Sequence, residues 1–236
     1  MKMKEENKIF INEKFIDEWE KKLDDSEYID NYTLMYIINH SHQERLRNRA
    51  ALKIFEQNPT NNQLCEVIRW ISSDEIREMA AKKLLKEDQL TNPELCIIIE
   101  WVNNAKIKDM AVERLFEQKP NNNQLRLVIV SDKKFAQRAG NLMFKNYQKD
   151  FYPDENDLFF LINWVDSLRL IAANELLRHN LSSKSKIRLL MKEVSELNDK
   201  LWPIYLKNKP TKAELEWVVE NIESLRPKAE EVLKNN

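Results

Sequence analysis

Glycine is almost absent from this sequence: it occurs once in 236 residues, and proline occurs seven times. Tight hairpin turns and the close backbone approach of a phosphate-binding loop both depend on glycine. The shortage therefore excludes a β-sandwich, a Rossmann fold and a glycine-rich nucleotide loop. Because apolar residues still make up 42% of the chain, a substantial core can form. The composition predicts an all-α protein.

Cysteine and long apolar runs are also scarce. Two cysteines in a chain of this length do not build a disulfide framework. The opening residues MKMKEENKIF lack the apolar core of a signal peptide, and no stretch approaches the roughly eighteen consecutive apolar residues of a membrane-spanning helix. These absences predict a soluble, cytoplasmic protein without a membrane segment.

Neither sign of charge dominates, since 38 Lys and Arg stand against 39 Asp and Glu. The chain thus has no overall basic field of the kind that attracts nucleic acid. Residues 121–149 are locally basic, with six cations, including Lys133, Lys134 and Arg138, against Asp132 alone. A solvated helix face accounts for such a run. The alternative is a local patch for an acidic protein segment or a phosphate backbone.

One stretch of eleven residues is repeated with few changes: LFEQKPNNNQL at 115–125 matches IFEQNPTNNQL at 54–64. Extending this similarity along the chain gives apolar anchor residues spaced 28 to 33 positions apart. The anchors are Leu34, Leu64, Leu95, Leu125, Leu158, Ile187 and Leu215. Four positions before each anchor lies a residue that can cap a helix. These residues are Asp30, Thr60, Thr91, Asn121, Asp154, Ser183 and Thr211.

Each anchor is predicted to open a helix. Thr60, Thr91 and Thr211 are each followed three residues later by Gln or Glu, which is the pattern of a capping box. Apolar residues then recur at the third, fourth and seventh positions after the anchor, which is the spacing of one helix face. A polar break follows, and then a second amphipathic segment with a small residue in register. The small residues are Ala50, Ala80, Ala111, Ala139, Ala172 and Ala229.

A pair of helices of this length cannot bury its own apolar face, whereas stacked copies share a continuous core. We therefore predict a solenoid of about seven helical hairpins of roughly 30 residues, forming one continuous domain over residues 30–236. Residues 1–29 are predicted to hold an N-terminal capping helix, because residues 9–23 carry apolar side chains on one face and charges elsewhere.

The segments SSDEIREMAAKKLL at 72–85 and VDSLRLIAANELL at 165–177 resemble the first helix of short HEAT-like repeats. In that family an acidic turn, a basic residue and an alanine pair recur. The resemblance implies a right-handed α-α superhelix that serves as a protein-binding scaffold, with the second helix of each HEAT-like pair on the concave side. The fourth predicted hairpin departs from the pattern at Gly140, where we expect a bend or a close contact, unless the glycine is a tolerated substitution.

No set of residues predicts catalysis or a bound cofactor. Cys65 and Cys96 each follow an anchor by one residue, and two thiols are too few for a metal site. His40 and His42 lie at an inter-helix turn without a third strong ligand in register. No nucleophile, base and orienting group come together as a set. The sequence predicts a protein that is not an enzyme, with no cofactor, metal or small-molecule substrate.

Two rows of side chains are candidates for partner binding. Trp70, Trp101 and Trp164 fall six residues after their anchors, and they form either part of the seam between hairpins or an exposed aromatic ridge. The second row falls two residues after the anchors, and it is either buried against the paired helix or exposed as an apolar strip on the concave face. Its candidate contact residues are Ile97, Leu127, Phe160, Leu189 and Trp217.

The sequence therefore predicts a non-enzymatic scaffold or adaptor that binds a partner protein or peptide on the concave face of an α-solenoid. Lys133, Lys134 and Arg138 are expected to steer acidic groups of that partner. The alternative is a HEAT-like nucleic-acid-binding protein that acts in DNA binding or repair through a basic groove in the middle repeats.

Overall fold

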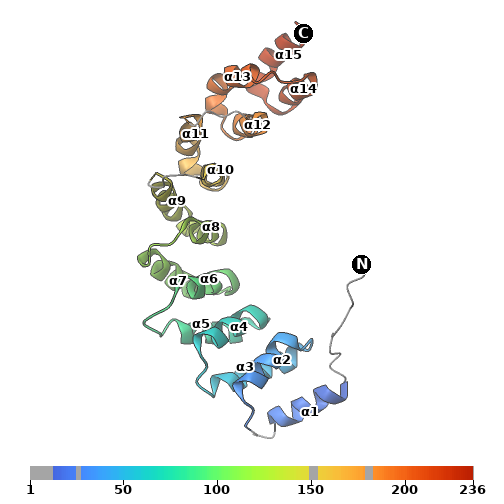
Figure 1. Ribbon diagram of the computed structural model, residues 1–236, viewed down its shortest axis with the longest axis vertical. Helices are drawn as coiled ribbons and strands as arrows, with labels where there is room; N and C mark the ends of the chain where they lie inside the picture. The colour runs from blue at the N-terminus through green and yellow to red at the C-terminus, as the bar shows by residue number, and fades with distance from the viewer. Residues whose placement is uncertain (1–12, 25–27, 149–153, 179–182, 236) are drawn as a thin grey trace, which may run out of the picture. The chain divides into compact units, whose positions relative to one another are not determined.

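The computed structural model describes residues 13–24, 28–148, 154–178 and 183–235. Within these ranges the chain forms fifteen α-helices and three short 3₁₀ helices, and it contains no strand (Figure 1). The all-α prediction is confirmed for this part of the chain. No helix in it is long and apolar enough to cross a membrane.

The chain divides into two compact units, which we call unit 1 (Met1–Pro120) and unit 2 (Asn121–Asn236). The helices of unit 1 are α1 (Glu13–Asp24), α2 (Asn31–His40), α3 (Glu44–Phe55), α4 (Asn61–Trp70), α5 (Asp74–Leu84), α6 (Asn92–Trp101) and α7 (Ala105–Glu117). The first helices of unit 2 are α8 (Asn122–Ser131), α9 (Lys133–Tyr147), α10 (Glu155–Trp164) and α11 (Arg169–Arg178). They are followed by α12 (Lys184–Glu193), α13 (Asn198–Lys207), α14 (Lys212–Asn221) and α15 (Arg226–Lys234).

The helices pack as adjacent pairs. The pairs are α2 with α3, α4 with α5, α6 with α7, α8 with α9, α10 with α11, α12 with α13, and α14 with α15. In each unit the even-numbered helices lie along one side and the odd-numbered helices of the pairs along the other (Figure 1). Helix α1 packs against α3. The prediction of a helical repeat is therefore confirmed as a series of packed neighbouring pairs, each of which we call a hairpin.

The predicted caps define the first helix of every pair. Asp30, Thr60, Thr91, Asn121, Asp154, Ser183 and Thr211 are the N-cap residues of α2, α4, α6, α8, α10, α12 and α14. The predicted capping boxes form at Thr60, Thr91 and Thr211, and a fourth forms at Asn121 with Gln124. A cap side chain accepts a hydrogen bond from a backbone N–H that has no partner within the helix. Local structure therefore explains the caps other than Ser183, whose side chain makes no such bond.

The duplicated stretch is a complete connection between two hairpins. Gln57 Nε2 donates to the Ile29 carbonyl at 2.9 Å, and Gln118 Nε2 donates to the Leu90 carbonyl at 2.8 Å. Each bond ties the end of a hairpin to the residue just before its own first N-cap. The next residue, Asn58 or Lys119, then adopts a positive φ of 51° or 53°. The proline that follows cannot continue the helix, and the cap of the next helix begins immediately after it.

The second helices start in two different ways. In unit 1, Ser73 and Asn104 cap α5 and α7 by accepting from the backbone N–H of Ile76 and Ile107. In unit 2, Asp132 caps α9, whereas α11, α13 and α15 are preceded by the 3₁₀ helices η1 (Asp166–Leu168), η2 (Ser195–Leu197) and η3 (Glu223–Leu225). All hairpins therefore share the helix pair, but from α11 onward a 3₁₀ helix replaces the side-chain cap in the turn.

The core consists of the residues that the repeat alignment selects. All seven anchors are at most 1% exposed, and the six alanines in register on the second helices are fully buried. Gly140 is buried as well, and a Cβ atom built on it would lie 3.0 Å from Leu168 Cδ1 and 3.2 Å from both γ-carbons of Val165. The expected close contact at this glycine is therefore present.

Candidate functional site

The candidate residues of the apolar row in unit 2 lie on four successive first helices. Leu127 is on α8, Phe160 on α10, Leu189 on α12 and Trp217 on α14. Leu189 is 38% exposed, and the other three are half-buried. They are oriented alike because each follows its buried anchor by two residues, which is about 200° around a helix. We call these four residues, together with Trp164, the aromatic strip.

Trp164 is the most exposed member of the aromatic strip. Its side chain is 53% exposed, and its ring stacks on Phe160, one turn earlier in α10, with the centroids 5.9 Å apart and the planes inclined by 20°. The prediction that tryptophans at this position pack into a seam does not describe Trp164. Its indole presents a large apolar face to solvent, with an N–H group that can donate a hydrogen bond.

Cations from neighbouring helices lie on the rings of the aromatic strip. The guanidinium group of Arg126, on α8, lies 5.4 Å from the ring centroid of Phe160 on α10. In the same way, the guanidinium group of Arg188, on α12, lies 5.4 Å from the ring of Trp217 on α14. Each cation is attracted to the electron-rich face of the ring and restricts its movement. Both arginines follow their anchors by one residue, so the same contact occurs twice.

Each of these arginines also meets a carboxylate on the helix whose ring it covers. Arg126 donates to Asp157 Oδ1 at 2.6 Å, and Arg188 lies 3.7 Å from Glu214 Oε1. Asp157 and Glu214 both immediately precede an anchor. An arginine, a carboxylate and an aromatic ring thus form the same cluster at two places in unit 2. We call them the Asp157 cluster and the Glu214 cluster.

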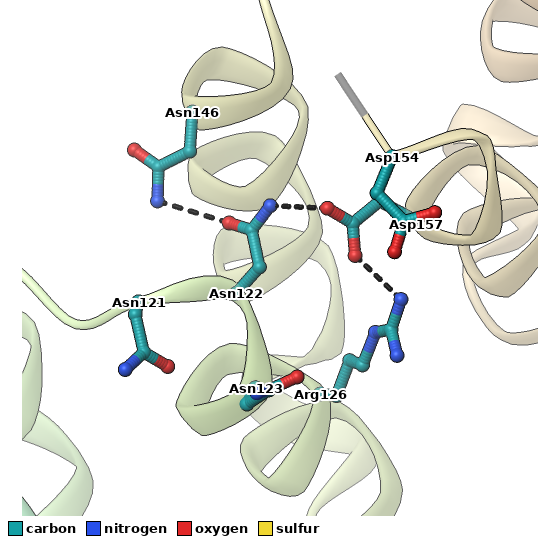
Figure 2. Close-up of a pocket in the computed structure, with 7 residues that line it drawn as sticks. All are labelled: Asn121, Asn122, Asn123, Arg126, Asn146, Asp154 and Asp157. Carbon is teal, nitrogen blue, oxygen red and sulfur yellow. Dashed lines mark hydrogen bonds and ion pairs between the residues drawn. The ribbon is translucent and has the colours of Figure 1, made fainter. Parts of the chain in front are cut away.

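The Asp157 cluster is buried and fastens three helices (Figure 2). Asp157 is 5% exposed, and its second oxygen accepts from Asn122 Nδ2 at 2.5 Å. Asn122 Oδ1 in turn accepts from Asn146 Nδ2 at 3.1 Å, which brings in the end of α9. These side chains line a hollow of about 500 Å³ beside the N-terminus of α10. Both oxygens of the buried Asp157 carboxylate therefore accept a hydrogen bond from a side chain of another helix.

The Glu214 cluster is more accessible and carries a perturbed carboxylate. Lys184 Nζ donates to Glu214 Oε2 at 2.7 Å, and the backbone N–H of Thr211 donates to the same oxygen at 2.8 Å. The hydrogen bond from Lys184, followed by that from Thr211, lowers the pKa of Glu214 to about 2. Between the two clusters, Lys186 of α12 pairs with Glu155 of α10 at 2.7 Å. Ion pairs therefore join each of the neighbouring first helices α8, α10, α12 and α14 to the next.

The candidate residues of unit 1 have a different setting. Ile97 is 7% exposed and lies in the core, so a partner would reach little of it. Trp70 and Trp101 are 47% and 39% exposed at the C-terminal ends of α4 and α6. Trp70 Nε1 donates to Glu66 Oε2 at 2.7 Å, and the Arg77 guanidinium group lies 6.0 Å from the ring of Trp101. The exposed-ridge alternative describes these two indoles better than the seam.

The basic candidates lie on a second helix rather than beside the aromatic strip. Lys133, Lys134 and Arg138 are exposed on α9. The ammonium group of Lys134 lies 4.9 Å from the ring of Phe135. Helix α9 lies on the odd-numbered side of unit 2, whereas the aromatic strip is carried by even-numbered helices (Figure 1).

Sequence reasoning identified the rings but missed the groups that hold them. Arg126, Arg188, Asp157 and Glu214 flank the anchors at fixed positions, so the repeat alignment already contained the signal. The thiols show no activation: burial raises the pKa of both Cys65 and Cys96 to about 11. Among the described residues, no group of three or more His, Cys, Asp or Glu could hold a metal ion.

Comparison with protein-family models, with curated proteins and with solved structures found no match to this chain.

Proposed function

We propose that this protein is a non-enzymatic scaffold or adaptor that binds a partner protein or peptide on the aromatic strip of unit 2. The observation that carries the proposal is the Phe160–Trp164 stack, whose indole is 53% exposed, on the same row of first helices as the exposed Leu189. Tryptophan, with arginine and tyrosine, is the residue type that contributes most to binding at protein interfaces. Contiguous exposed apolar side chains with a polar rim are typical of interaction sites.

The rigidity of the aromatic strip supports binding without large rearrangement. Phe160 is held by Arg126, and Trp217 is held by Arg188, while both arginines are in turn oriented by carboxylates. Rings that are fixed before binding lose little conformational entropy when a partner arrives. The partner is expected to present an apolar side chain to Trp164 and Leu189, because these are the most exposed apolar side chains of the strip.

We further propose that the hairpins form a HEAT-like right-handed superhelix with the partner on its concave side. HEAT-like repeats divide the chain differently from the hairpins described above. In a HEAT-like repeat the alanine-bearing helix is the first helix, and the anchor-bearing helix that follows it in the chain is the second. In unit 1 the anchor-bearing helices α2, α4 and α6 pack on one another more extensively than α3, α5 and α7 do. Closer packing on one side of a stack supports a curve with that side inward.

The test compares two matched surface variants. Trp164→Ala with Leu189→Ala removes the two most exposed side chains of the aromatic strip, and Met79→Ala with Met110→Ala removes two equally exposed apolar side chains of unit 1. A partner captured from the native host is purified and titrated against each variant. We expect the first pair to weaken binding by about tenfold or more, and the control pair to leave it unchanged. Equal affinity for both variants and the unchanged protein would refute the aromatic strip as the binding surface.

Nucleic-acid binding is a second candidate because Lys133, Lys134 and Arg138 are exposed on one helix. A phosphate backbone bound there would release counterions, so the affinity would fall steeply as salt rises. A titration with a DNA duplex at low and high salt tests this. Absence of binding at low salt removes the nucleic-acid candidate, and binding that survives Lys133→Glu with Lys134→Glu assigns it to another surface.

A further inference from the structure

The odd-numbered side of unit 2 contains an open hollow of about 580 Å³, which is within the range of about 300–1,000 Å³ typical of ligand sites. Phe144 of α9 and Ile171 and Leu177 of α11 provide its apolar lining. Ile171 is 50% exposed, and the adjacent Leu170 is 43% exposed. Large aliphatic side chains are rarely left so accessible on neighbouring positions of one helix unless something covers them.

Cations border this apolar lining. Arg178 of α11 and Lys200 of α13 both line the hollow. Glu175, the carboxylate of the lining, accepts from Arg178 NH1 at 2.8 Å, which leaves other guanidinium donors available. Lys200 forms no ion pair with any described residue. Lys145, next to Phe144, is exposed and likewise without an ion pair in the described part of the chain. The border of the hollow is therefore positively charged.

We propose that this hollow binds a short acidic segment of a partner protein, with one large apolar side chain seated on Phe144, Ile171 and Leu177 and flanking carboxylates on Arg178 and Lys200. The partner must contribute an aliphatic or aromatic side chain, because a charged group would not bury the apolar surface of Ile171. The remaining donors of Arg178 and the ammonium group of Lys200 set the sign of the flanking charges, because a basic segment would be repelled. This site is independent of the aromatic strip, which lies on the even-numbered side of unit 2.

The test is an unbiased selection of short random peptides displayed against the full-length protein. Enriched sequences are expected to carry a Leu, Ile, Phe, Met or Trp flanked by Asp or Glu. Individual peptides are then titrated by fluorescence anisotropy against Ile171→Ser and against Arg178→Glu with Lys200→Glu. Each change should weaken binding by about tenfold or more, since it removes the apolar seat or reverses the flanking charge. All three residues are exposed, so circular dichroism should show unchanged helicity.

Matched controls use the same chemical changes in unit 1. Met79→Ser imitates the loss of an exposed apolar side chain, and Lys86→Glu with Lys106→Glu imitates the charge reversal. Both should bind the selected peptides as the unchanged protein does.

The proposal would be overturned by enriched peptides without acidic bias. It would also be overturned if Ile171→Ser bound the peptides with the same affinity as the unchanged protein. An oligothymidylate that competes for the site and is insensitive to Ile171→Ser would overturn it too, because that outcome indicates a site for phosphate alone. Peptides that lose affinity only with Trp164→Ala belong to the aromatic strip.

Discussion

In unit 1 the residue after the anchor is Cys65 in α4 and Cys96 in α6, whereas in unit 2 the same position holds Arg126 in α8 and Arg188 in α12. The cysteines fill this position with a small apolar group. The arginines instead reach the next first helix and meet a carboxylate and an aromatic ring there. The residue after the anchor thus makes an apolar packing contact in α4 and α6 of unit 1 but belongs to a polar cluster in α8 and α12 of unit 2.

The carboxylate of these clusters is present in unit 1 without its arginine. Glu94 precedes the anchor of α6, as Asp157 precedes that of α10. Burial is the main reason that the pKa of Cys65 rises to about 11, and the nearby Glu94 carboxylate raises it further. The comparison teaches that the acid alone does not form the cluster, which also requires an arginine after the preceding anchor to meet both the acid and the ring.

The largest expected effect comes from making unit 2 resemble unit 1. Arg126→Met removes the cation from the buried Asp157, so we expect a loss of about 2–3 kcal/mol in the free energy of unfolding. The loss is measured by urea denaturation, with amide hydrogen exchange in α8 and α10 as the local readout. Lys145→Met, an exposed cation on α9, is the control and should change stability by less than about 0.5 kcal/mol.

A second substitution decides whether charge is the cause. Adding Asp157→Asn to Arg126→Met replaces a lone buried carboxylate with a neutral amide, and we expect it to recover about 1 kcal/mol or more. If the double variant is less stable than Arg126→Met alone, the contribution of Arg126 is packing over Phe160 and not compensation of a buried charge.

The next effect tests the close contact that distinguishes α9 from α7. Val112 of α7 follows its buried alanine, and Gly140 of α9 occupies the same position against Val165 and Leu168. Gly140→Ala should gain about 1 kcal/mol in helix propensity but lose about 1–3 kcal/mol through overpacking, which makes it destabilising overall. In a Val165→Ala background the same change should become stabilising. Thermal unfolding of the four proteins measures this, and additive effects would contradict a contact between these residues.

A smaller effect concerns the left-handed residues of the duplicated connection in unit 1. Lys119 has a φ of 53°, in the region where side chains are strained, whereas Asn58 at 51° has a side chain that tolerates it better. We expect Lys119→Gly to raise the free energy of unfolding by about 0.5–1 kcal/mol and Asn58→Gly to raise it less. Urea denaturation of the two variants provides the comparison. A larger gain from Asn58→Gly would contradict the account of strain.

The last effect concerns Glu214 and is measured through the dependence of stability on pH. Its pKa is lowered from the ordinary 4.5 to about 2, so its carboxylate stabilises the fold above pH 4.5, and this contribution is lost as the pH falls toward 2. Glu214→Gln keeps a capping side chain but loses the charge, and its stability should therefore fall less steeply across this window. Glu216→Gln, on the exposed side of α14, is the control and should retain the original slope. Identical slopes for all three proteins would rule out the ion pair with Lys184 as the cause.

Much of the local fold could be predicted from the sequence because its signals are local. A cap residue four positions before each anchor identified all seven first helices, since a Thr or Asp at a helix start acts through its own backbone neighbours. The buried alanines followed from spacing in the same way. The capping box at Asn121 was not predicted, although Gln124 follows three residues later and Asn accepts the same hydrogen bond as Thr.

The site was predicted less completely because its contacts join residues about thirty positions apart. Phe160 and Trp164 were named from their place after the anchor, but nothing local to Arg126 indicates that it meets Asp157. Likewise, the exposure of Trp164 depends on which neighbouring helix covers it, and helix spacing does not determine that. Ile97 and Phe160 occupy the same register position, and yet Ile97 is buried and Phe160 is half-buried. The position of a residue in the repeat predicts the direction in which its side chain points away from the helix axis, whereas the exposure of that side chain depends on tertiary packing.

The hydrogen bonds of Gln57 and Gln118 have a consequence for how such a chain can grow. Each amide binds a carbonyl at the beginning of its own hairpin, not in the following one. A gene segment that encodes one hairpin therefore encodes both the donor and the acceptor of this hydrogen bond. Inserting or deleting such a segment at the proline boundary leaves no glutamine amide without its acceptor in the neighbouring hairpins. Two near-identical boundaries are what a chain lengthened by copying whole hairpins would retain.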